Sequence, residues 1–310
     1  MEDLNPVLRL QDNLNRSVIG KEAVIRKLLV CLLAEGHVLL EDVPGVGKTT
    51  LARALANSMD ATFGRIQFTP DTLPQDVTGA SIYHMKTGEF CYRPGAVMHQ
   101  ILLADEINRT PPKTQASLLE AMTEKQVTVD NVSYPLPELF FVIATQNPAG
   151  FLGTYPLPEA QLDRFMMRLG IGYPDTDAEK RMASLFLSGQ LDARPKAVCT
   201  ANDILLARQA VKAVTVRENV LAYMEEIVAS TRTEAAFLLG ASPRALLALL
   251  RASQASAYLR GRDFVKPDDV RDIATEVLLH RLVLTPDSKI RKESADRILR
   301  RLILSAKIPV

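Results

Sequence analysis

The sequence predicts an α/β fold in which a parallel five-stranded sheet lies between layers of helices, followed by a smaller domain built of helices alone. Two observations carry this prediction. Up to about residue 173, short apolar runs alternate with segments of helical periodicity, and after residue 174 the runs typical of strands stop. We therefore expect an α/β core over residues 1–173 and an all-α domain over residues 174–310.

Five short apolar runs are expected to form the strands of the sheet. They contain little polar alternation, which is typical of parallel strands that are buried on both faces. Helical segments between them, such as Thr49–Asn57 and Lys113–Thr123, predict βαβ crossovers that place helices against the sheet. The expected strands are Val38–Leu40, Arg65–Phe68, Ile101–Ala104, Phe140–Ala144 and Leu169–Tyr173.

The second half of the chain has the pattern of a series of helices. Thr176 and Glu179 have the spacing of a capping box, which predicts a helix start there. Ser242 followed by Pro243 predicts another start, because serine is a frequent N-cap and proline is tolerated in the first turn. The expected helices are Ala178–Leu187, Asn202–Ala210, Asn219–Thr231, Pro243–Tyr258, Pro267–His280 and Ser288–Leu304.

Two segments interrupt the expected alternation of strands and helices in the core. Gln126–Tyr134 alternates apolar and polar residues around Asp130-Asn131, which predicts a β-hairpin. Residues 69–99 carry glycines and prolines around aromatic residues, which predicts a long loop with short strands of its own.

The charge balance gives no sign of a highly charged partner. Lysine and arginine total 37 against 36 acidic residues, so the formal net charge of +1 does not indicate nucleic acid or a membrane surface. No apolar run approaches the roughly 20 residues that cross a bilayer, and the N-terminus lacks the pattern of a signal peptide. We therefore expect a cytoplasmic protein.

Neither the cysteines nor the histidines have the spacing of a metal site. The cysteines Cys31, Cys91 and Cys199 are odd in number and far apart, so we expect no disulfide framework and no zinc site. The four histidines are expected to be structural; they are His37, His84, His99 and His280.

The segment from His37 to Thr50 contains the parts of a P-loop, a phosphate-binding turn between a strand and a helix. An apolar strand precedes the turn Pro44-Gly45-Val46-Gly47, and Lys48-Thr49-Thr50 opens a helix. Backbone N–H groups of such a turn point at phosphate oxygens, the lysine reaches the β- and γ-phosphates, and the next hydroxyl binds Mg²⁺. Asp42 stands where the usual pattern has a glycine, but the glycines nearest the phosphates are present.

Polar residues at the ends of two later strands predict hydrolysis of the bound nucleotide. Asp105 and Glu106 stand in the order expected if Asp105 holds the Mg²⁺ shell and Glu106 orients and deprotonates the attacking water. Asn147 follows the next strand, where an amide can sense the γ-phosphate. Taken alone, the acidic pair is equally compatible with an ordinary strand-to-loop turn, and Asn147 with a turn residue. The preceding P-loop favours the catalytic interpretation.

Two arginines are candidates for contacts with the transferred phosphate. Arg164 follows a short helix, and an arginine supplied by a neighbouring subunit accelerates phosphoryl transfer by ~10³–10⁵. Taken alone, Arg164 is better explained as a surface ion pair with Asp163. Arg244 lies in the first turn of the helix that begins at Pro243, from which it can close over a γ-phosphate.

Together these residues resemble the AAA+ ATPases, P-loop NTPases with an αβα core and a small helical lid, and within them the MoxR family. The resemblance covers nearly the whole chain. It implies that Lys48 and Thr49 belong to Walker A, Asp105 and Glu106 to Walker B, and Asn147 to sensor 1. Its most specific segments are LLEDVPGVGKTTLA, LLADEINRTPPKTQASLLEAM, ATQNPAGFLGTYPLPEAQLDRF and GASPRAL.

The same resemblance assigns the arginines and the inserted segments. Arg164 would be the arginine finger, with Arg168 as a nearby competitor, and Arg244 would be sensor 2, acting on its own or on a neighbour's nucleotide. Val18-Ile19-Gly20 resembles the family's adenine-side contact. Residues 69–99 resemble the helix-2 insert and residues 126–134 the pre-sensor-1 hairpin, two insertions shared with magnesium chelatase and the replicative helicases.

Membership of such a family would imply an assembly and a type of work. The implied cofactors are ATP and Mg²⁺, and the implied homo-oligomer is a ring, usually a hexamer, with ATP at the subunit interfaces. The implied role is chaperone-like, in remodelling, assembling or maturing other proteins, often with von Willebrand factor A-domain partners.

Other classes of P-loop protein fit less well. A GTPase would carry an Asn-Lys-x-Asp motif, and the ABC-like segment Leu187-Ser188-Gly189-Gln190 is one glycine short and follows Asp105 instead of preceding it. A small-molecule kinase would not need Asn147 and two arginines together. A helicase- or chelatase-like motor stays open because it shares the core and inserts. A nucleotide-dependent scaffold also stays open, although the intact Glu106 argues against it.

Overall fold

A parallel five-stranded sheet forms the centre of the core in the computed structural model, which describes residues 4–43, 45–147, 153–189 and 195–308. The strands lie in the order β2-β5-β8-β1-β9, and every neighbouring pair is parallel. The predicted α/β fold is therefore confirmed. The strands are β1 (Val38–Glu41), β2 (Phe63–Gln67), β5 (Ile101–Asp105), β8 (Phe141–Gln146) and β9 (Met167–Leu169).

The last strand differs most from its expected range. β9 ends at Leu169, so most of the apolar run 169–173 lies in the connection that leaves the sheet. Among the described strands, β9 pairs only with β1, whose last residue paired to it is Leu40, opposite Leu169, and Gly172 with φ +65° then takes the chain out of the strand conformation.

Different helices cover the two faces of the sheet because successive strand residues point to opposite faces. Leu40, Leu103 and Ile143 belong to one apolar cluster with the first three helices, whereas Leu39 and Leu102 belong to a second cluster with α5. The core is thus an αβα sandwich. The helices concerned are α1 (Leu4–Ser17), α2 (Glu22–Leu33), α3 (Lys48–Ser58) and α5 (Pro112–Glu124).

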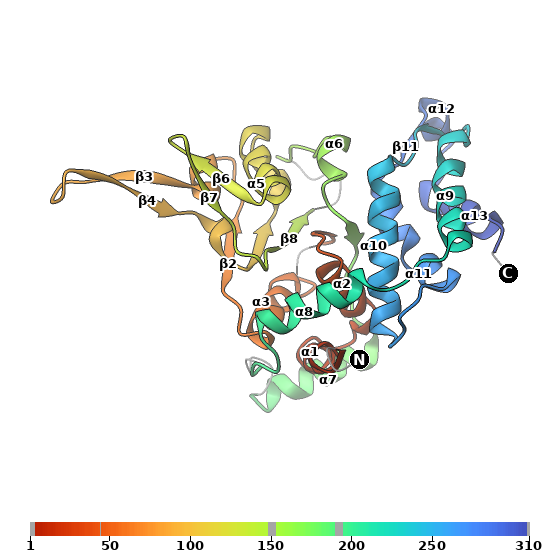
Figure 1. Cartoon of the computed structure of the whole chain (residues 1–310), viewed down its shortest axis with the longest axis horizontal. Helices are drawn as coiled ribbons and strands as arrows, with labels where there is room; N and C mark the ends of the chain where they lie inside the picture. Colours follow the sequence, from red (N-terminus) through yellow and green to blue (C-terminus); the bar gives the residue numbers. More distant parts are fainter. Residues whose placement is uncertain (1–3, 44, 148–152, 190–194, 309–310) are drawn as a thin grey trace.

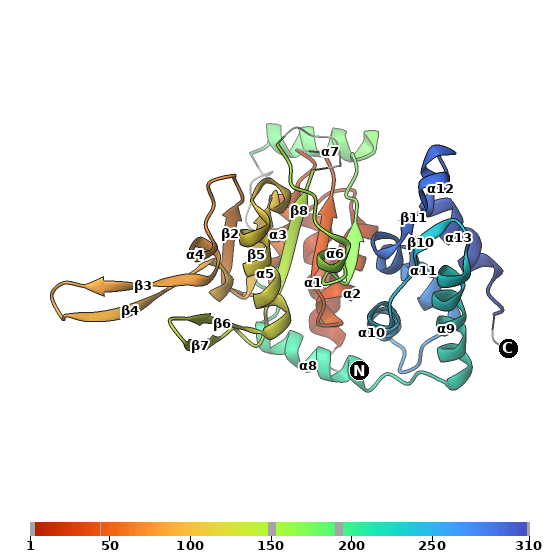
Figure 2. The ribbon, with the colours of Figure 1, turned by 90° about the horizontal axis from the view of Figure 1, so that it is seen from above.

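The helices from α9 to α13 form a lid beside the sheet edge that ends in β9, whereas α7 and α8 lie along the core (Figure 2). The packing of α11 against β9 joins the lid to the core, and α8 packs against α1, α2 and α10. No helix in the described ranges is both long enough and apolar enough to span a membrane. The elements after β9 are α7 (Thr176–Leu187), α8 (Ala201–Lys212), α9 (Glu218–Thr233), β10 (Phe237–Leu239), α10 (Pro243–Leu259), α11 (Pro267–Leu278), η3 (Leu279–Arg281), β11 (Val283–Leu284), α12 (Pro286–Ile290) and α13 (Ala295–Ser305).

Three details of this helical region differ from the sequence prediction. The single helix expected over 288–304 is broken into α12 and α13, because Lys292 has φ +55° and Ser294 caps a new helix. The first helix is capped by Asp175 and not by a Thr176 capping box, since the Asp175 carboxylate accepts the Ala178 N–H. A short antiparallel pair, β10 with β11, lies among the helices.

Both predicted insertions contain hairpins, and they lie side by side (Figure 1). The turn of the second hairpin is Asp130-Asn131, and both residues have positive φ, as a tight two-residue turn requires. The first hairpin projects far beyond the core, and its Tyr92 ring stacks on Tyr134 of the second at 3.9 Å between centroids. The remaining elements are α4 (Pro74–Thr78), β3 (Gly79–His84), β4 (Glu89–Pro94), η1 (Ala96–Met98), η2 (Ile107–Arg109), β6 (Gln126–Val129), β7 (Val132–Pro135) and α6 (Glu159–Leu162).

Candidate active site

The turn between β1 and α3 has the backbone of a phosphate cradle. Gly45 and Gly47 have φ values of +87° and +92°, which residues with a side chain rarely adopt, and nothing lies within 4 Å of where a Cβ would stand on either. Gly47 is the N-cap of α3, and no side chain caps the N–H groups of the first turn, which contains Thr49 and Thr50. These donors are therefore open to phosphate oxygens. Pro44 lies outside the described residues, and Val46 is nearly buried.

Lys48 extends back over this turn into a group of acids. Its Nζ donates to the backbone oxygen of Asp42 at 2.5 Å. Burial lowers the pKa of Lys48, and the charges of Asp42, Asp105 and Glu106 act in the opposite direction. The lysine and both predicted Walker B acids thus share one electrostatic environment at the carboxyl edge of the sheet.

Asp42 has structural partners that the motif alone does not suggest. Its carboxylate accepts the N–H of Val43 at 2.9 Å and the N–H of Gly172 at 2.5 Å. The buried Lys21 holds the same segment, because its Nζ donates to the backbone oxygens of Ile171 and Gly172 at 3.0 and 2.9 Å. Asp42 therefore ties the P-loop to the connection that leaves the core.

The Asp105 carboxylate, at the end of β5, is held by two side chains from neighbouring strands. The hydroxyl of Thr145 donates to Asp105 Oδ1 at 2.7 Å, and Arg65 forms an ion pair with Oδ2 at 2.8 Å. Thr145 also accepts the Glu106 N–H at 2.8 Å, so one hydroxyl positions both acids.

Glu106 and Asn147 lie within hydrogen-bonding distance. Glu106 has φ +57°, an uncommon conformation that turns its side chain out of the strand, and its Oε1 accepts from Asn147 Nδ2 at 3.3 Å. Gln67 donates to the other carboxylate oxygen at 2.9 Å, and Arg109 forms an ion pair with it at 3.0 Å. Asn147 itself is buried.

Four of these partners were missed by sequence reasoning: Arg65, Gln67, Arg109 and Thr145. Two of them lie on β2, about forty residues before the acids, and reach them only because β2 pairs with β5 so that Gln67 stands opposite Asp105. Thr145 and Arg109 lie beside predicted site residues in the sequence, and their polar character at a strand end was the available signal.

The predicted adenine-side segment lies next to the connection held by Asp42. Val18 and Ile19 are nearly buried, and Gly20 has φ +70°. A Cβ on Gly20 would stand 2.7 Å from the Cβ of Ala178, so the segment packs closely against the first turn of α7.

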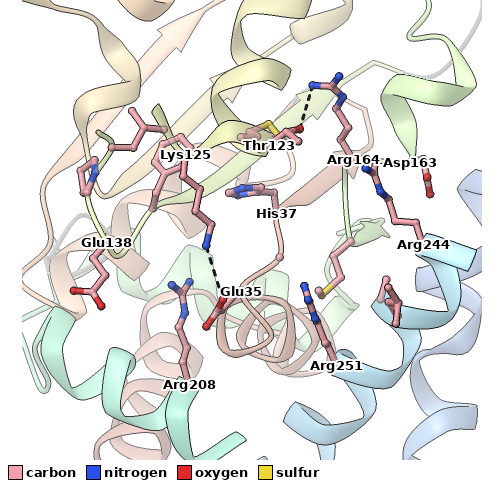
Figure 3. Close-up of a pocket in the computed structure, with 18 of the residues that line it drawn as sticks. Glu35, His37, Thr123, Lys125, Glu138, Asp163, Arg164, Arg208, Arg244 and Arg251 are labelled. Atoms are coloured by element: carbon pink, nitrogen blue, oxygen red, sulfur yellow. Dashed lines mark hydrogen bonds and ion pairs between the residues drawn. The ribbon is translucent and has the colours of Figure 1, made fainter. Parts of the chain in front are cut away.

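Arg164 and Arg244 line one cavity, of about 460 Å³, between the core and the lid (Figure 3). Arg164 donates to the Leu119 backbone oxygen at 2.5 Å and to the Thr123 hydroxyl at 3.1 Å. The alternative pair of Arg164 with Asp163 is not formed in the described part of the chain, because Asp163 instead pairs with the buried Arg281 at 2.6 Å.

This cavity lies at the opposite end of β1 from the P-loop. Gly36 and His37, which precede β1, line it, whereas the P-loop follows the last residue of that strand. A four-residue strand spans roughly 13 Å. The predicted site residues therefore fall into two groups, one around Lys48 and one around Arg164.

Arg168 belongs to neither group. It forms an ion pair with Glu41 at 2.8 Å, at the end of β1, and does not line the cavity that contains Arg164. Among the described residues, no group of three histidine, cysteine or acidic side chains is placed to hold a metal ion. A Mg²⁺ site here would therefore take most of its oxygens from water and phosphate, which is usual for this ion.

Comparisons with known proteins agree with this architecture. Residues 37–167 match the family model of the ATPase family associated with various cellular activities (AAA), and residues 229–302 match that of the AAA lid domain. A solved structure of a candidate ATPase from Cytophaga hutchinsonii is similar to the whole chain, with a TM-score of 0.92, 38% identity, and 100% of this chain and 96% of that chain covered.

Relatives match over nearly the full length as well. The chain is 49% identical to YeaC of Bacillus subtilis, with 100% of this chain and 97% of YeaC covered. It is 38% identical to the chaperone MoxR1 of Mycobacterium tuberculosis, with 95% and 80% covered, and 32% identical to the protein MoxR of Methylorubrum extorquens, with 92% and 89% covered. The chain is a member of the MoxR family of AAA+ ATPases.

Proposed function

We propose that this chain hydrolyses ATP to ADP and phosphate with Mg²⁺, at sites that two neighbouring subunits share. The observation that carries the proposal is the division of the polar residues. One group combines a phosphate cradle, a lysine, two acids and an amide at the carboxyl edge of the sheet, and a separate cavity contains both Arg164 and Arg244.

The first group would bind the nucleotide. The open N–H groups of Gly45, Gly47 and the first turn of α3 would hold the phosphates, and Lys48 would turn from Asp42 to the γ-phosphate. Thr49 and Asp105 would hold Mg²⁺, which neutralises phosphate charge. The oxygen donors fit this ion, and Mg²⁺ would compete with Arg65 for Asp105. Val18, Ile19 and Gly20 would contact the adenine.

Glu106 would act on the attacking water. Its carboxylate, held beside Asn147, can accept a proton from water while the amide orients that water. Gln67 and Arg109 both contact Oε2 of Glu106, so Oε1, beside Asn147, would be the oxygen that accepts the proton from water.

Arg164 and Arg244 would act on the nucleotide of the neighbouring subunit. The length of β1 separates them from their own P-loop, which favours action across an interface for both arginines. The pairing of Arg168 with Glu41 favours Arg164 over Arg168 as the finger.

Shared sites require a homo-oligomer, and we propose that it is a closed hexameric ring in the cytoplasm. The relative named a chaperone supports a chaperone-like role, in which hydrolysis remodels or assembles other proteins. A partner with a von Willebrand factor A domain is part of the same proposal.

Phosphate release by wild type and by Glu106→Gln tests the hydrolysis. The amide keeps the shape of the side chain but cannot accept the proton, so we expect ATP binding to persist and turnover to fall by about 10²–10⁴. Equally small rates in both proteins would favour the nucleotide-dependent scaffold.

A further inference from the structure

The cavity that contains Arg164 and Arg244 extends to other cations that the proposed function does not use. Arg208 of α8 and Arg251 of α10, which we call the floor arginines, reach into it from the side of Glu35 (Figure 3). Lys125, which follows α5, reaches across the cavity to a loose ion pair with Glu35, at 3.9 Å.

Arg208 is built into the protein with part of its guanidinium unsatisfied. The residue is only 5% exposed, and its Nε donates to the Leu32 backbone oxygen at 3.0 Å. Its Nη2 is buried and has no hydrogen-bond partner among the described residues. A buried charged donor without a partner is costly, so an anion that accepted from it would be bound favourably.

Arg251 extends the row of cations along α10. Arg244, Leu247 and Arg251 are all exposed and share one face of the helix, since they are three and four residues apart. The two arginines are separated by roughly 10 Å along the axis. Neither forms a hydrogen bond or ion pair with a described side chain. The helix thus places two guanidinium groups along one side of the cavity (Figure 3).

The charge of the lining is strongly positive. Six cationic side chains face three acidic ones, which gives a formal charge of +3 in a chain whose total is +1. Two of the acids are already paired, Asp163 with Arg281 and Glu35 with Lys212 at 2.5 Å. Guanidinium groups match the geometry of phosphate oxygens, so the excess favours a small, multiply charged oxyanion.

We propose that the floor arginines, with Lys125, form an oxyanion site separate from the P-loop, and that it receives the inorganic phosphate released from the neighbouring subunit's nucleotide. The second part rests on the proposed action of Arg164 and Arg244 across the interface. Phosphate leaving those two arginines passes along α10 to Arg251 and Arg208, away from the ADP, without any covalent step.

Binding of inorganic phosphate to nucleotide-free Lys48→Ala protein tests the site. This background weakens the P-loop, and calorimetric titration at constant ionic strength is expected to show saturable binding of one phosphate per chain. Adding Arg251→Ala removes one charge-assisted contact and should weaken binding by roughly ten- to a hundredfold. Arg251 is exposed, so its loss leaves the fold intact, and Arg93→Ala on the projecting hairpin is the matched control.

The pattern of variants decides the outcome. Absence of saturable binding overturns the proposal, as does binding that survives Arg251→Ala and is lost with Arg164→Ala.

Product inhibition tests the second part of the proposal: phosphate should inhibit the ATPase of wild type at least tenfold more strongly than that of Arg251→Ala. Equal inhibition overturns the product-receiving role. If the wild-type protein did not hydrolyse ATP but the Lys48→Ala protein still bound phosphate, that result would count against the proposed function and not against the oxyanion site.

Discussion

At the scale of single residues, Asp42 departs from the usual P-loop motif and makes hydrogen bonds that hold the loop in place. The residue replaces a glycine of the usual P-loop pattern, and its two carboxylate oxygens accept N–H groups from Val43 and Gly172. A glycine could bridge neither. The P-loop and the connection to the lid are therefore linked by one side chain.

Asp42→Asn should weaken this link without changing its shape. The amide has one accepting oxygen instead of two, so one N–H loses its partner, and the free energy of unfolding should fall by about 1 kcal/mol. Urea denaturation of Asp42→Asn beside Asp60→Asn, an exposed position after α3 and outside the P-loop, measures the difference. Equal effects of the two substitutions would contradict the bridging role.

The buried His37 predicts a pH dependence of stability. Burial, with Arg208 nearby, lowers its pKa to about 3, and its Nδ1 accepts the Val142 N–H at 3.0 Å. In the unfolded chain this group takes up a proton near pH 6.5. The unfolded state therefore binds more protons between pH 6.5 and 3, so this stability is complete above pH 6.5 and is lost as the pH falls toward 3, by about 1.4 kcal/mol per unit.

His37→Asn removes the titrating group and keeps an oxygen that can accept the same N–H. Urea unfolding at pH 7.5 and 5.5 should show about 1 kcal/mol less acid destabilisation in this variant than in wild type. His84→Asn, on the exposed hairpin, is the matched control. A pH dependence equal in wild type and His37→Asn would contradict the prediction.

The candidate site was predictable where its residues are neighbours in the sequence. Lys48 and Thr49 belong to one short motif, and Asp105 and Glu106 belong to another, so the sequence alone predicts their chemistry. Arg65 and Gln67 were not predicted, because only the pairing of β2 with β5 brings them to the acids. The Asp42–Gly172 bond joins residues 130 positions apart, and nothing local marks it.

At the scale of elements, the start of α10 fixes where Arg244 stands. Ser242 accepts the Ala245 N–H at 3.2 Å and donates to Asp163 at 3.4 Å, and Pro243 occupies the first position. The helix start and the lid–core contact thus depend on the same hydroxyl.

Ser242→Ala should reduce ATPase activity by more than its effect on stability explains. Loss of the cap costs about 1 kcal/mol, and Arg244 loses its fixed position. Ser294→Ala removes the equivalent cap of α13, far from both groups of site residues, and should lower stability similarly with no loss of ATP turnover. Equal activities in the two variants would contradict the positioning of Arg244 by this cap.

The strands were easier to predict than the helix boundaries. Strands buried on both faces leave continuous apolar runs, and each of the five expected runs overlaps a strand. The break between α12 and α13 was missed, although Ser294 is a frequent N-cap residue type, and the positive φ of Lys292 marks it in the structure. α1 and α2 were not predicted; their buried residues join the same apolar cluster as Leu40 and Leu103 of the sheet.

At the scale of the whole molecule, the projecting hairpin and the lid lie at opposite ends (Figure 2). The P-loop group and the arginine cavity lie at opposite ends of β1. A single chain therefore carries two incomplete halves of the proposed site. The halves meet only if the arginine cavity of one subunit faces the P-loop of the next, as they would in the proposed ring.

Mixing Arg164→Ala with Lys48→Ala protein tests this division most directly. Each variant alone should lack ATP hydrolysis, because Arg164→Ala has no arginine finger and Lys48→Ala has no lysine to bind the phosphates. In a mixed ring, an Arg164→Ala subunit keeps Lys48 and receives Arg164 from its Lys48→Ala neighbour, so the account predicts that phosphate release returns to a substantial fraction of the wild-type rate. Phosphate release that stays at the level of the separate variants, in rings shown to contain both chains, would contradict the shared site.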